Sequence, residues 1–203
     1  MTAVFDYGAG NLRSVANTLE SVSAPFKIVT DAAELARAER IILPGVGHYG
    51  QLLRSLDRLQ VRAAMCDRIA SGVPFLGICL GLQALFESSE EAPDKGLGIY
   101  RGRVVRFRED ARVPHMGWNQ LEVRDGSRLL RGTGRRPYVY FANSYYVPSA
   151  AAGARAAAGC TYAGTTFCAA LESGNVFGVQ FHPEKSGPVG QRIVRNFLEA
   201  QPC

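Results

Sequence analysis

The segment Gly77-Ile78-Cys79-Leu80-Gly81 constrains the fold of this chain most, because it directly follows the apolar run 73–76. Such a run predicts a buried strand, and residues 82–86 are mostly good helix formers. A small nucleophile flanked by glycines between a strand and a helix is typical of a nucleophile elbow, in which Gly77 and Gly81 keep side chains out of a crowded turn. A helix N-terminus stabilises a thiolate. The motif therefore predicts a cysteine-dependent enzyme, although a merely buried Cys79 is the alternative on this motif alone.

The first half of the chain alternates short strands with amphipathic helices. Strands are predicted at 3–5, 26–29, 41–43 and 73–78, and helices at 12–19 and, in two pieces, at 52–70. This order predicts an α/β fold with a mostly parallel central sheet and helices on both faces. Active sites of such sheets lie at the carboxyl ends of the strands, where both Cys79 and the glycine-rich turn 44–47 are expected.

The second half favours additional, antiparallel strands. They are predicted at 102–107, 120–123, 138–146, 165–171 and 176–181, with turns at 125–126 and 173–175 and a final helix over 189–198. The small residues of 150–158 predict a loop or a short turn of helix. We see no linker or repeat, so the sequence predicts one domain over residues 1–203.

Composition narrows the setting in which the protein works. No apolar run approaches the ~20 residues that span a bilayer, and the N-terminus lacks a signal-peptide pattern. Five cysteines without regular spacing do not form a disulfide framework, which predicts a cytoplasmic protein. Apart from Cys79, the cysteines are expected to be structural or incidental: Cys66, Cys160, Cys168 and Cys203.

The net charge of +5 comes from scattered arginines, including Arg101, Arg103, Arg106 and Arg108. A nucleic-acid surface is one interpretation, and an acidic partner or a phosphorylated metabolite is another. No nucleic-acid-binding motif accompanies the arginines, so we favour a solvated face. The three histidines lack metal-ligand spacing, and we expect neither a metal nor a cofactor.

A thiolate nucleophile needs a base and an orienting group. His182 follows a predicted strand, and Glu184 would lie on the same side as His182 if the chain stays extended through Pro183. This predicts a Cys79–His182–Glu184 triad. The oxyanion of the intermediate needs backbone donors, for which we predict the N–H of Leu80 and that of Val46 or Gly47.

These motifs resemble those of the class I (triad) glutamine amidotransferases. The nucleophile signature is 77–83, and the His–Glu signature is 181–184. Further segments resemble the glutaminase subunits of imidazole glycerol phosphate synthases, which belong to histidine biosynthesis: 6–11, 44–48, 114–119 and 180–186. The resemblance covers essentially the whole chain and implies the three-layer amidotransferase fold.

The resemblance also implies a reaction and roles for individual residues. Cys79 would attack the side-chain amide of glutamine, and the ammonia would pass to a (βα)8-barrel cyclase subunit that forms imidazole glycerol phosphate and an aminoimidazole carboxamide ribotide (AICAR). Residues matching glutamine-binding positions are Gly47, Gln83, Glu91, Ser144 and Tyr145, and those matching positions near the partner are Asn11, Tyr140 and Lys185.

One position departs from the family pattern, since Asn143 stands where the family often has histidine. Ser144 and Tyr145 are retained, so we expect glutamine binding to survive. Trp118 is interpreted either as an interface anchor or as a core residue. We further expect the isolated chain to be nearly inactive, because ammonia released in solution would be wasted.

Three alternatives stay open. A glutaminase subunit of pyridoxal phosphate synthesis is disfavoured by segment 114–119, and a non-catalytic binding module is disfavoured by the intact triad. A free-standing cysteine hydrolase acting on γ-glutamyl substrates would be fully active without a partner.

Overall fold

The structure is a computed structural model that describes residues 1–9 and 11–201. Gly10, within the Asp6–Asn11 segment, and Cys203 lie outside the described residues, as does Pro202. No helix within the described part of the chain is long and apolar enough to cross a membrane.

The N-terminal half forms the parallel part of the sheet. Strands β1 (Thr2–Phe5), β2 (Phe26–Val29), β3 (Arg40–Gly45) and β4 (Phe75–Cys79) lie in the order β2-β1-β3-β4. Strand β13 (Val176–Val179) extends this parallel set beside β4. The register pairs Gly45 with Cys79, so the ends of β3 and β4 lie side by side, as predicted.

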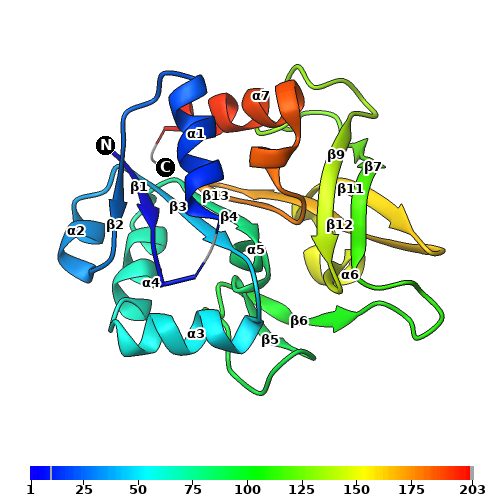
Figure 1. Cartoon of the computed structure of the whole chain (residues 1–203), viewed down its shortest axis with the longest axis horizontal. Coiled ribbons are helices and arrows are strands. Elements are labelled where there is room, and N and C mark those ends of the chain that lie inside the picture. The colour runs from blue at the N-terminus through cyan, green and yellow to red at the C-terminus, as the bar shows by residue number, and fades with distance from the viewer. Residues whose placement is uncertain (10, 202–203) are drawn as a thin grey trace.

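Helices cover both faces of this sheet, which confirms the predicted architecture (Figure 1). On one face lie α1 (Leu12–Ser21) and α7 (Gly187–Leu198). On the other lie α2 (Ala32–Ala36), α3 (Tyr49–Arg58) and α4 (Arg62–Ala70). Side chains alternate along the strands: in β1, Phe5 packs in the core beneath α3 and α4, whereas Val4 packs in the core beneath α1 and α7.

The C-terminal half adds antiparallel strands, as predicted. The sheet continues from β13 through β12 (Thr165–Ser173), β10 (Tyr145–Pro148), β6 (Tyr100–Arg106) and β5 (Phe86–Ser89). Strand β11 (Ala156–Tyr162) pairs with β12 and with β8 (Glu122–Val123). A separate two-stranded sheet consists of β7 (His115–Gln120) and β9 (Tyr138–Asn143). Between β10 and β11 lie the short turns of helix α6 (Ser149–Ala152) and η1 (Gly153–Arg155).

Several element predictions were wrong in detail. The helix after Cys79 is only α5 (Leu80–Gln83), and Phe86 begins β5. The predicted strand 138–146 is divided at Ser144, the predicted strand 120–123 is divided at Leu121, and the predicted strand 176–181 ends at Val179. Residues 156–158 belong to β11, which pairs with both β12 and β8, and Ala157 and Ala158 are buried there. Pro44 and Gly45 extend β3, so the turn is confined to 46–48.

Candidate active site

The direct junction of β4 with α5, at Cys79, forms the predicted elbow. Cys79 has φ 54° and ψ −104°, a strained backbone conformation for a residue with a side chain. A Cβ on Gly81 would overlap the carbonyl oxygen of Leu43, and one on Gly77 would overlap the backbone of Gly81. The two flanking glycines are therefore required by the close approach of β3, β4 and α5, and this packing holds Cys79 in its strained conformation.

His182 and Glu184 form a buried pair beside Cys79. The Nδ1 of His182 lies 2.8 Å from the Oε1 of Glu184, and both side chains are 3% exposed. The backbone N–H of His182 donates to the carbonyl oxygen of Tyr140 at 2.8 Å, which ties the histidine to β9. His182 itself is extended, as expected of a residue before proline, but the extended path through Pro183 is not found, since 183–185 form a turn of 3₁₀-helix, η2 (Pro183–Lys185). The turn nevertheless brings the carboxylate onto the imidazole ring.

The protonation of His182 follows from its neighbours. Burial opposes the charged imidazolium, but hydrogen bonds to the Cys79 sulfur and the Glu184 carboxylate outweigh it and raise the pKa of His182 to about 10. Because Nδ1 is bonded to Glu184, the other ring nitrogen, Nε2, is the one that bonds to the Cys79 sulfur. An imidazolium at neutral pH favours a thiolate partner, which is the reactive form of cysteine.

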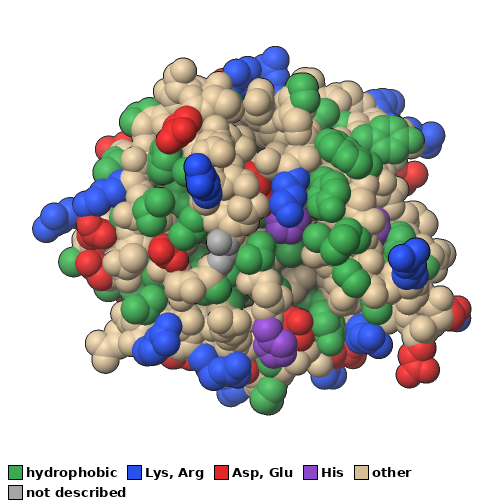
Figure 2. All heavy atoms as spheres, in the orientation of Figure 1, with side chains coloured by type: hydrophobic (Ala, Val, Ile, Leu, Met, Phe, Trp, Pro, Cys, Tyr) green, Lys and Arg blue, Asp and Glu red, His purple; other side chains and the backbone are tan. Residues whose placement is uncertain are grey.

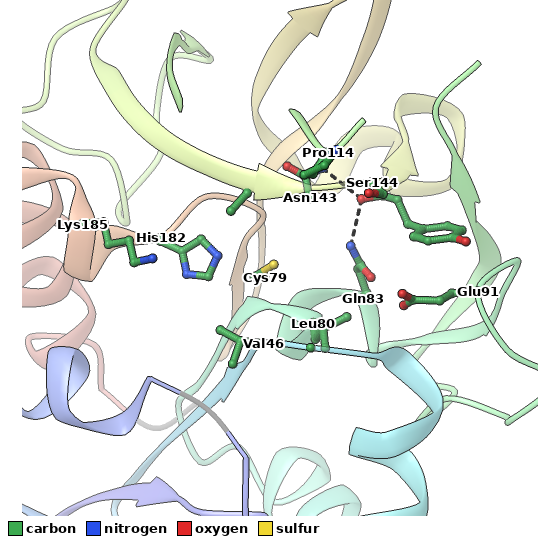
Figure 3. Close-up of a pocket in the computed structure, with 13 residues that line it drawn as sticks. Val46, Cys79, Leu80, Gln83, Glu91, Pro114, Asn143, Ser144, His182 and Lys185 are labelled. Carbon is green, nitrogen blue, oxygen red and sulfur yellow. Dashed lines mark hydrogen bonds between the residues drawn. The ribbon is translucent and has the colours of Figure 1, made fainter. Parts of the chain in front are cut away.

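A pocket of about 280 Å³ opens in front of Cys79. Figure 3 shows Cys79 between His182 on one side and Gln83 on the other. Its lining contains every predicted oxyanion and glutamine-binding residue: Val46, Gly47, Leu80, Gln83, Glu91, Ser144 and Tyr145. Lys185 also lines the pocket, together with Pro114, Ala142 and Asn143, for which no role was predicted.

Two polar side chains in the pocket present oxygen atoms. Glu91 accepts a hydrogen bond from the backbone N–H of Tyr49 at 2.9 Å, at the start of α3. The Nε2 of Gln83 donates to the Tyr145 carbonyl oxygen at 2.9 Å, whereas its Oε1 is buried without a partner. A buried acceptor without a donor is costly, so the pocket is suited to a ligand that brings N–H groups.

The predicted oxyanion donor Val46 is already engaged. Its backbone N–H donates to the hydroxyl oxygen of Tyr7 at 3.0 Å, and the same hydroxyl donates to the carbonyl oxygen of Val46 at 3.0 Å. Tyr7 is 1% exposed, and burial raises the pKa of its hydroxyl to about 12. In this conformation the Val46 N–H is not available to bind an oxyanion in the pocket.

Of the three residues predicted near a partner, Lys185 and Tyr140 lie together beside the pocket. The Lys185 ammonium lies 5.5 Å from the centre of the Tyr140 ring, and Trp118 packs edge-on against the same ring. Asn11 lies apart from the pocket at the start of α1, where its Oδ1 accepts a hydrogen bond from Ser14. Trp118 is 57% exposed, so its interpretation as a core residue was wrong.

An exposed apolar patch surrounds Trp118. Strand register places Met116, Trp118 and Tyr138 on one face of the β7–β9 pair, and each is more than half exposed. We call these three residues the β7–β9 patch. Hydrophobic side chains gather over β7 and β9 in Figure 2.

The remaining sequence predictions concern other surfaces and side chains. Arg101, Arg103, Arg106 and Arg108 are exposed, as expected of a solvated face. Cys66, Cys160 and Cys168 are free thiols, and burial raises the pKa of Cys160 and of Cys168 to about 12. Among the described residues, no cluster of three or more His, Cys, Asp or Glu side chains has the geometry of a metal site.

Two contacts with the site were not predicted. Tyr7 lies in the 6–11 segment and Gln180 in the 180–186 segment, but neither was assigned a role. A hydroxyl that binds a peptide group 39 positions away has no sequence signature. The same holds for the Gln180 amide, which contacts the Cys79 sulfur from the end of the neighbouring strand β13.

Comparison with known proteins identifies the family of the chain. The family model for class-I glutamine amidotransferases matches residues 3–200. A solved glutamine amidotransferase has the same fold, with a TM-score of 0.76 at 21% identity over 98% of this chain and 97% of that one. The chain therefore belongs to the class-I glutamine amidotransferase family.

Several relatives with higher identity are named imidazole glycerol phosphate synthase subunit HisH. The protein from Methanothermobacter thermautotrophicus is 44% identical, over 98% of each chain. That from Deinococcus radiodurans is 43% identical, over 96% of this chain and 91% of the relative. The Arabidopsis thaliana chloroplastic protein hisHF is 45% identical over 98% of this chain, which corresponds to 34% of that longer protein. Within the amidotransferases, the chain belongs to the HisH family.

Proposed function

We propose that this chain is the glutaminase subunit of an imidazole glycerol phosphate synthase, and that it supplies ammonia for histidine biosynthesis. The observation that carries the proposal is the buried set of Cys79, His182 and Glu184 at the mouth of a pocket in a chain of the HisH family. The proposal treats residues 1–203 as one amidotransferase domain, and needs no cofactor or metal.

The reaction we propose begins with attack of the Cys79 thiolate on the side-chain amide carbon of glutamine. His182 then gives its proton to the leaving nitrogen, ammonia departs, and a thioester remains on Cys79. The neutral imidazole next takes a proton from water, which attacks the thioester and releases glutamate. Glu184 holds the ring orientation and stabilises the imidazolium in both steps.

Glutamine binding is proposed for the residues that line the pocket beyond Cys79. The unpartnered Oε1 of Gln83 and the carboxylate of Glu91 are acceptors that suit an α-amino group. Gly47, Ser144 and Tyr145 complete the wall around the other end of the substrate. Asn143 fills the position that the family often gives to histidine, and its Nδ2 donates to the Tyr145 carbonyl oxygen at 2.9 Å.

We propose that the isolated chain is nearly inactive because its oxyanion hole is incomplete. Leu80 supplies one backbone donor, whereas the Val46 N–H is held by Tyr7. Reorientation of the 45–46 peptide would release the Val46 N–H, and reorientation of the 46–47 peptide, whose carbonyl oxygen Tyr7 also binds, would turn the Gly47 N–H as a second donor. One such donor stabilises the transition state by about 3–4 kcal/mol. Its absence would therefore make glutamine hydrolysis by the isolated chain slow.

The proposed partner is a (βα)8-barrel cyclase subunit that binds along the β7–β9 patch, with Asn11, Tyr140 and Lys185 nearby. The fused plant relative named hisHF is consistent with a second functional part next to a HisH-like one. A cytoplasmic location is also proposed, since a nucleophilic thiol works only in its reduced form.

The first test is ammonia release from glutamine by the purified chain, alone and with a cyclase subunit and a nucleotide ligand. We expect strong activation by the partner, and no activity in Cys79→Ala under any condition. Rapid hydrolysis without a partner would instead identify a free-standing hydrolase. Absence of activity in every condition would favour a binding module.

A further inference from the structure

A buried chain of side-chain amides ends on the nucleophile. The Gln180 side chain is fully buried just beyond the end of β13, and its Nε2 lies 3.5 Å from the Sγ of Cys79. Its Oε1 accepts a hydrogen bond from the Nε2 of Gln83 at 3.0 Å, and that same nitrogen donates to the Tyr145 carbonyl oxygen at 2.9 Å. Three residues far apart in sequence thus meet behind Cys79.

The hydrogen-bond chemistry fixes the direction of this chain. A backbone carbonyl oxygen only accepts, so the atom of Gln83 that faces Tyr145 must be its NH₂ group. That group also faces Gln180, so the Gln180 atom opposite it must be the oxygen. The remaining atom of Gln180, which faces Cys79, is therefore an N–H donor.

The sulfur is the acceptor in this contact, because an amide nitrogen does not accept hydrogen bonds. A thiolate is a far better acceptor than a thiol, and hydrogen bonds to ionised groups are about twice as strong as neutral ones. The site is buried, so solvent does not replace a lost donor there. The contact therefore favours the reactive, ionised form of Cys79 over the thiol.

We propose that Gln180 is a further catalytic residue, whose side-chain amide stabilises the Cys79 thiolate, and that Gln83 is the positioning residue that orients this amide. The inference rests on the proposed function only in taking Cys79 as the nucleophile. Gln83 would then act twice, with its Nε2 on Gln180 and its Oε1 toward glutamine.

The test measures the reactivity of Cys79 without substrate or partner. The isolated chain is alkylated with iodoacetamide from pH 5 to pH 10, and Cys79→Ala supplies the background from the other cysteines. Gln180→Met keeps the length of the side chain and removes its amide. We expect the midpoint of the alkylation profile to rise by about one pH unit, and alkylation near neutral pH to slow about tenfold.

Two further variants make the result decisive. Gln83→Met leaves the Gln180 amide in place without its orienting partner, and should move the profile in the same direction by less. If Gln180→Met unfolds below the assay temperature, the result for Gln83→Met decides the test.

The matched control is Gln191→Met. Gln191 is a half-buried residue of α7, and its substitution should leave the alkylation profile unchanged. A wild-type profile in Gln180→Met, or in Gln83→Met when only that variant folds, would overturn the inference.

Glutamine hydrolysis with the cyclase subunit separates this inference from the proposed function. If the wild type is active, Gln180→Met should lower kcat about tenfold with little change in KM, since the amide touches the nucleophile and not the pocket wall. If the wild type is inactive but the alkylation profile shifts as expected, the proposed function fails and the role of Gln180 stands.

Discussion

At the scale of single residues, the geometry of the site is fixed by a few specific hydrogen bonds and close packing contacts. The Tyr7 hydroxyl holds both the N–H and the carbonyl oxygen of Val46, and the strained backbone of Cys79 is held by packing at Gly77 and Gly81. Small changes at such groups should therefore alter activity more than stability.

Tyr7→Phe keeps the aromatic ring but removes the hydroxyl that is hydrogen-bonded to the backbone N–H and carbonyl oxygen of Val46. We expect the hydrolysis of glutamine by the isolated chain to rise about tenfold, since the loss of about 1.4 kcal/mol of restraint makes the donor-exposing conformation more populated. The rate of ammonia release from glutamine measures this change in activity. Tyr162→Phe is the control, because its hydroxyl also donates to a backbone oxygen, that of Arg112, outside the pocket. Unchanged activity in Tyr7→Phe would show that this contact does not limit the reaction.

The charge on His182 gives a second prediction at this scale. Its imidazole should titrate near pH 10 in an NMR titration of the folded chain, and Glu184→Gln should lower that pKa by about one to two units, because a neutral amide no longer favours the cation. The stabilisation from its charged pair is complete below pH 6.5 and is lost as the pH rises toward about 10. Activity with the partner should fall about 10²-fold or more in Glu184→Gln. A His182 that titrates at its ordinary value would contradict the pairing.

At the scale of elements, the β7–β9 pair carries a buried histidine on its inner face. His115 is stacked between the rings of Phe141 and Tyr162, and its Nε2 lies 3.2 Å from the amide of Asn119. Burial lowers the pKa of His115 to about 4. The folded β7–β9 pair is therefore stable only while the His115 ring is neutral.

This predicts an acid-labile strand pair. Above pH 6.5 the folded and unfolded chains both carry a neutral His115. As the pH falls from 6.5 toward about 4, only the unfolded chain gains the proton, so stability is lost by up to about 1.4 kcal/mol per pH unit. His115→Phe should flatten this slope relative to wild type in urea denaturation at pH 4.5, 5.5 and 7.5. Parallel slopes in the two proteins would exclude His115 as the source.

The elements that the sequence predicted well are those with a strong local signal. The apolar run before Cys79 predicted β4, which is buried on both faces, and the spacing of Val15 and Leu19 predicted α1, which buries one face. Helix α2 was missed, although Asp31 caps it by accepting the backbone N–H of Glu34 at 2.8 Å, an Asp-x-x-Glu pattern that marks a helix start.

Other features depend on tertiary contacts that no local pattern encodes. The alanines of β11 form a strand because β12 and β8 provide partners on both sides. The triad residues were predicted from their types and order, but the turn that brings Glu184 onto His182 was not. Likewise, Tyr7 and Gln180 reach the site only through the fold.

At the scale of the whole molecule, the pocket and the β7–β9 patch are joined by one strand. Tyr140 of β9 packs against Trp118 on the outer face, and its carbonyl oxygen accepts the backbone N–H of His182. Further along β9, Ala142 and Asn143 line the pocket. A protein that binds the patch would therefore contact the strand whose backbone holds His182.

This arrangement predicts that the patch contributes to partner binding and not to folding. Trp118→Ala should weaken association with the cyclase subunit by about 2 kcal/mol, measured by titration calorimetry, because large aromatic anchors dominate interface energies. Thermal stability of the free chain should change little, since the side chain is 57% exposed. Ile28→Ala is the matched control: Ile28 is 43% exposed on β2, an edge strand of the main sheet that lies on the opposite side of the molecule from β7 and β9 (Figure 1), and its loss should leave the affinity unchanged. Equal affinities for Trp118→Ala and wild type would place the partner on another face of the molecule.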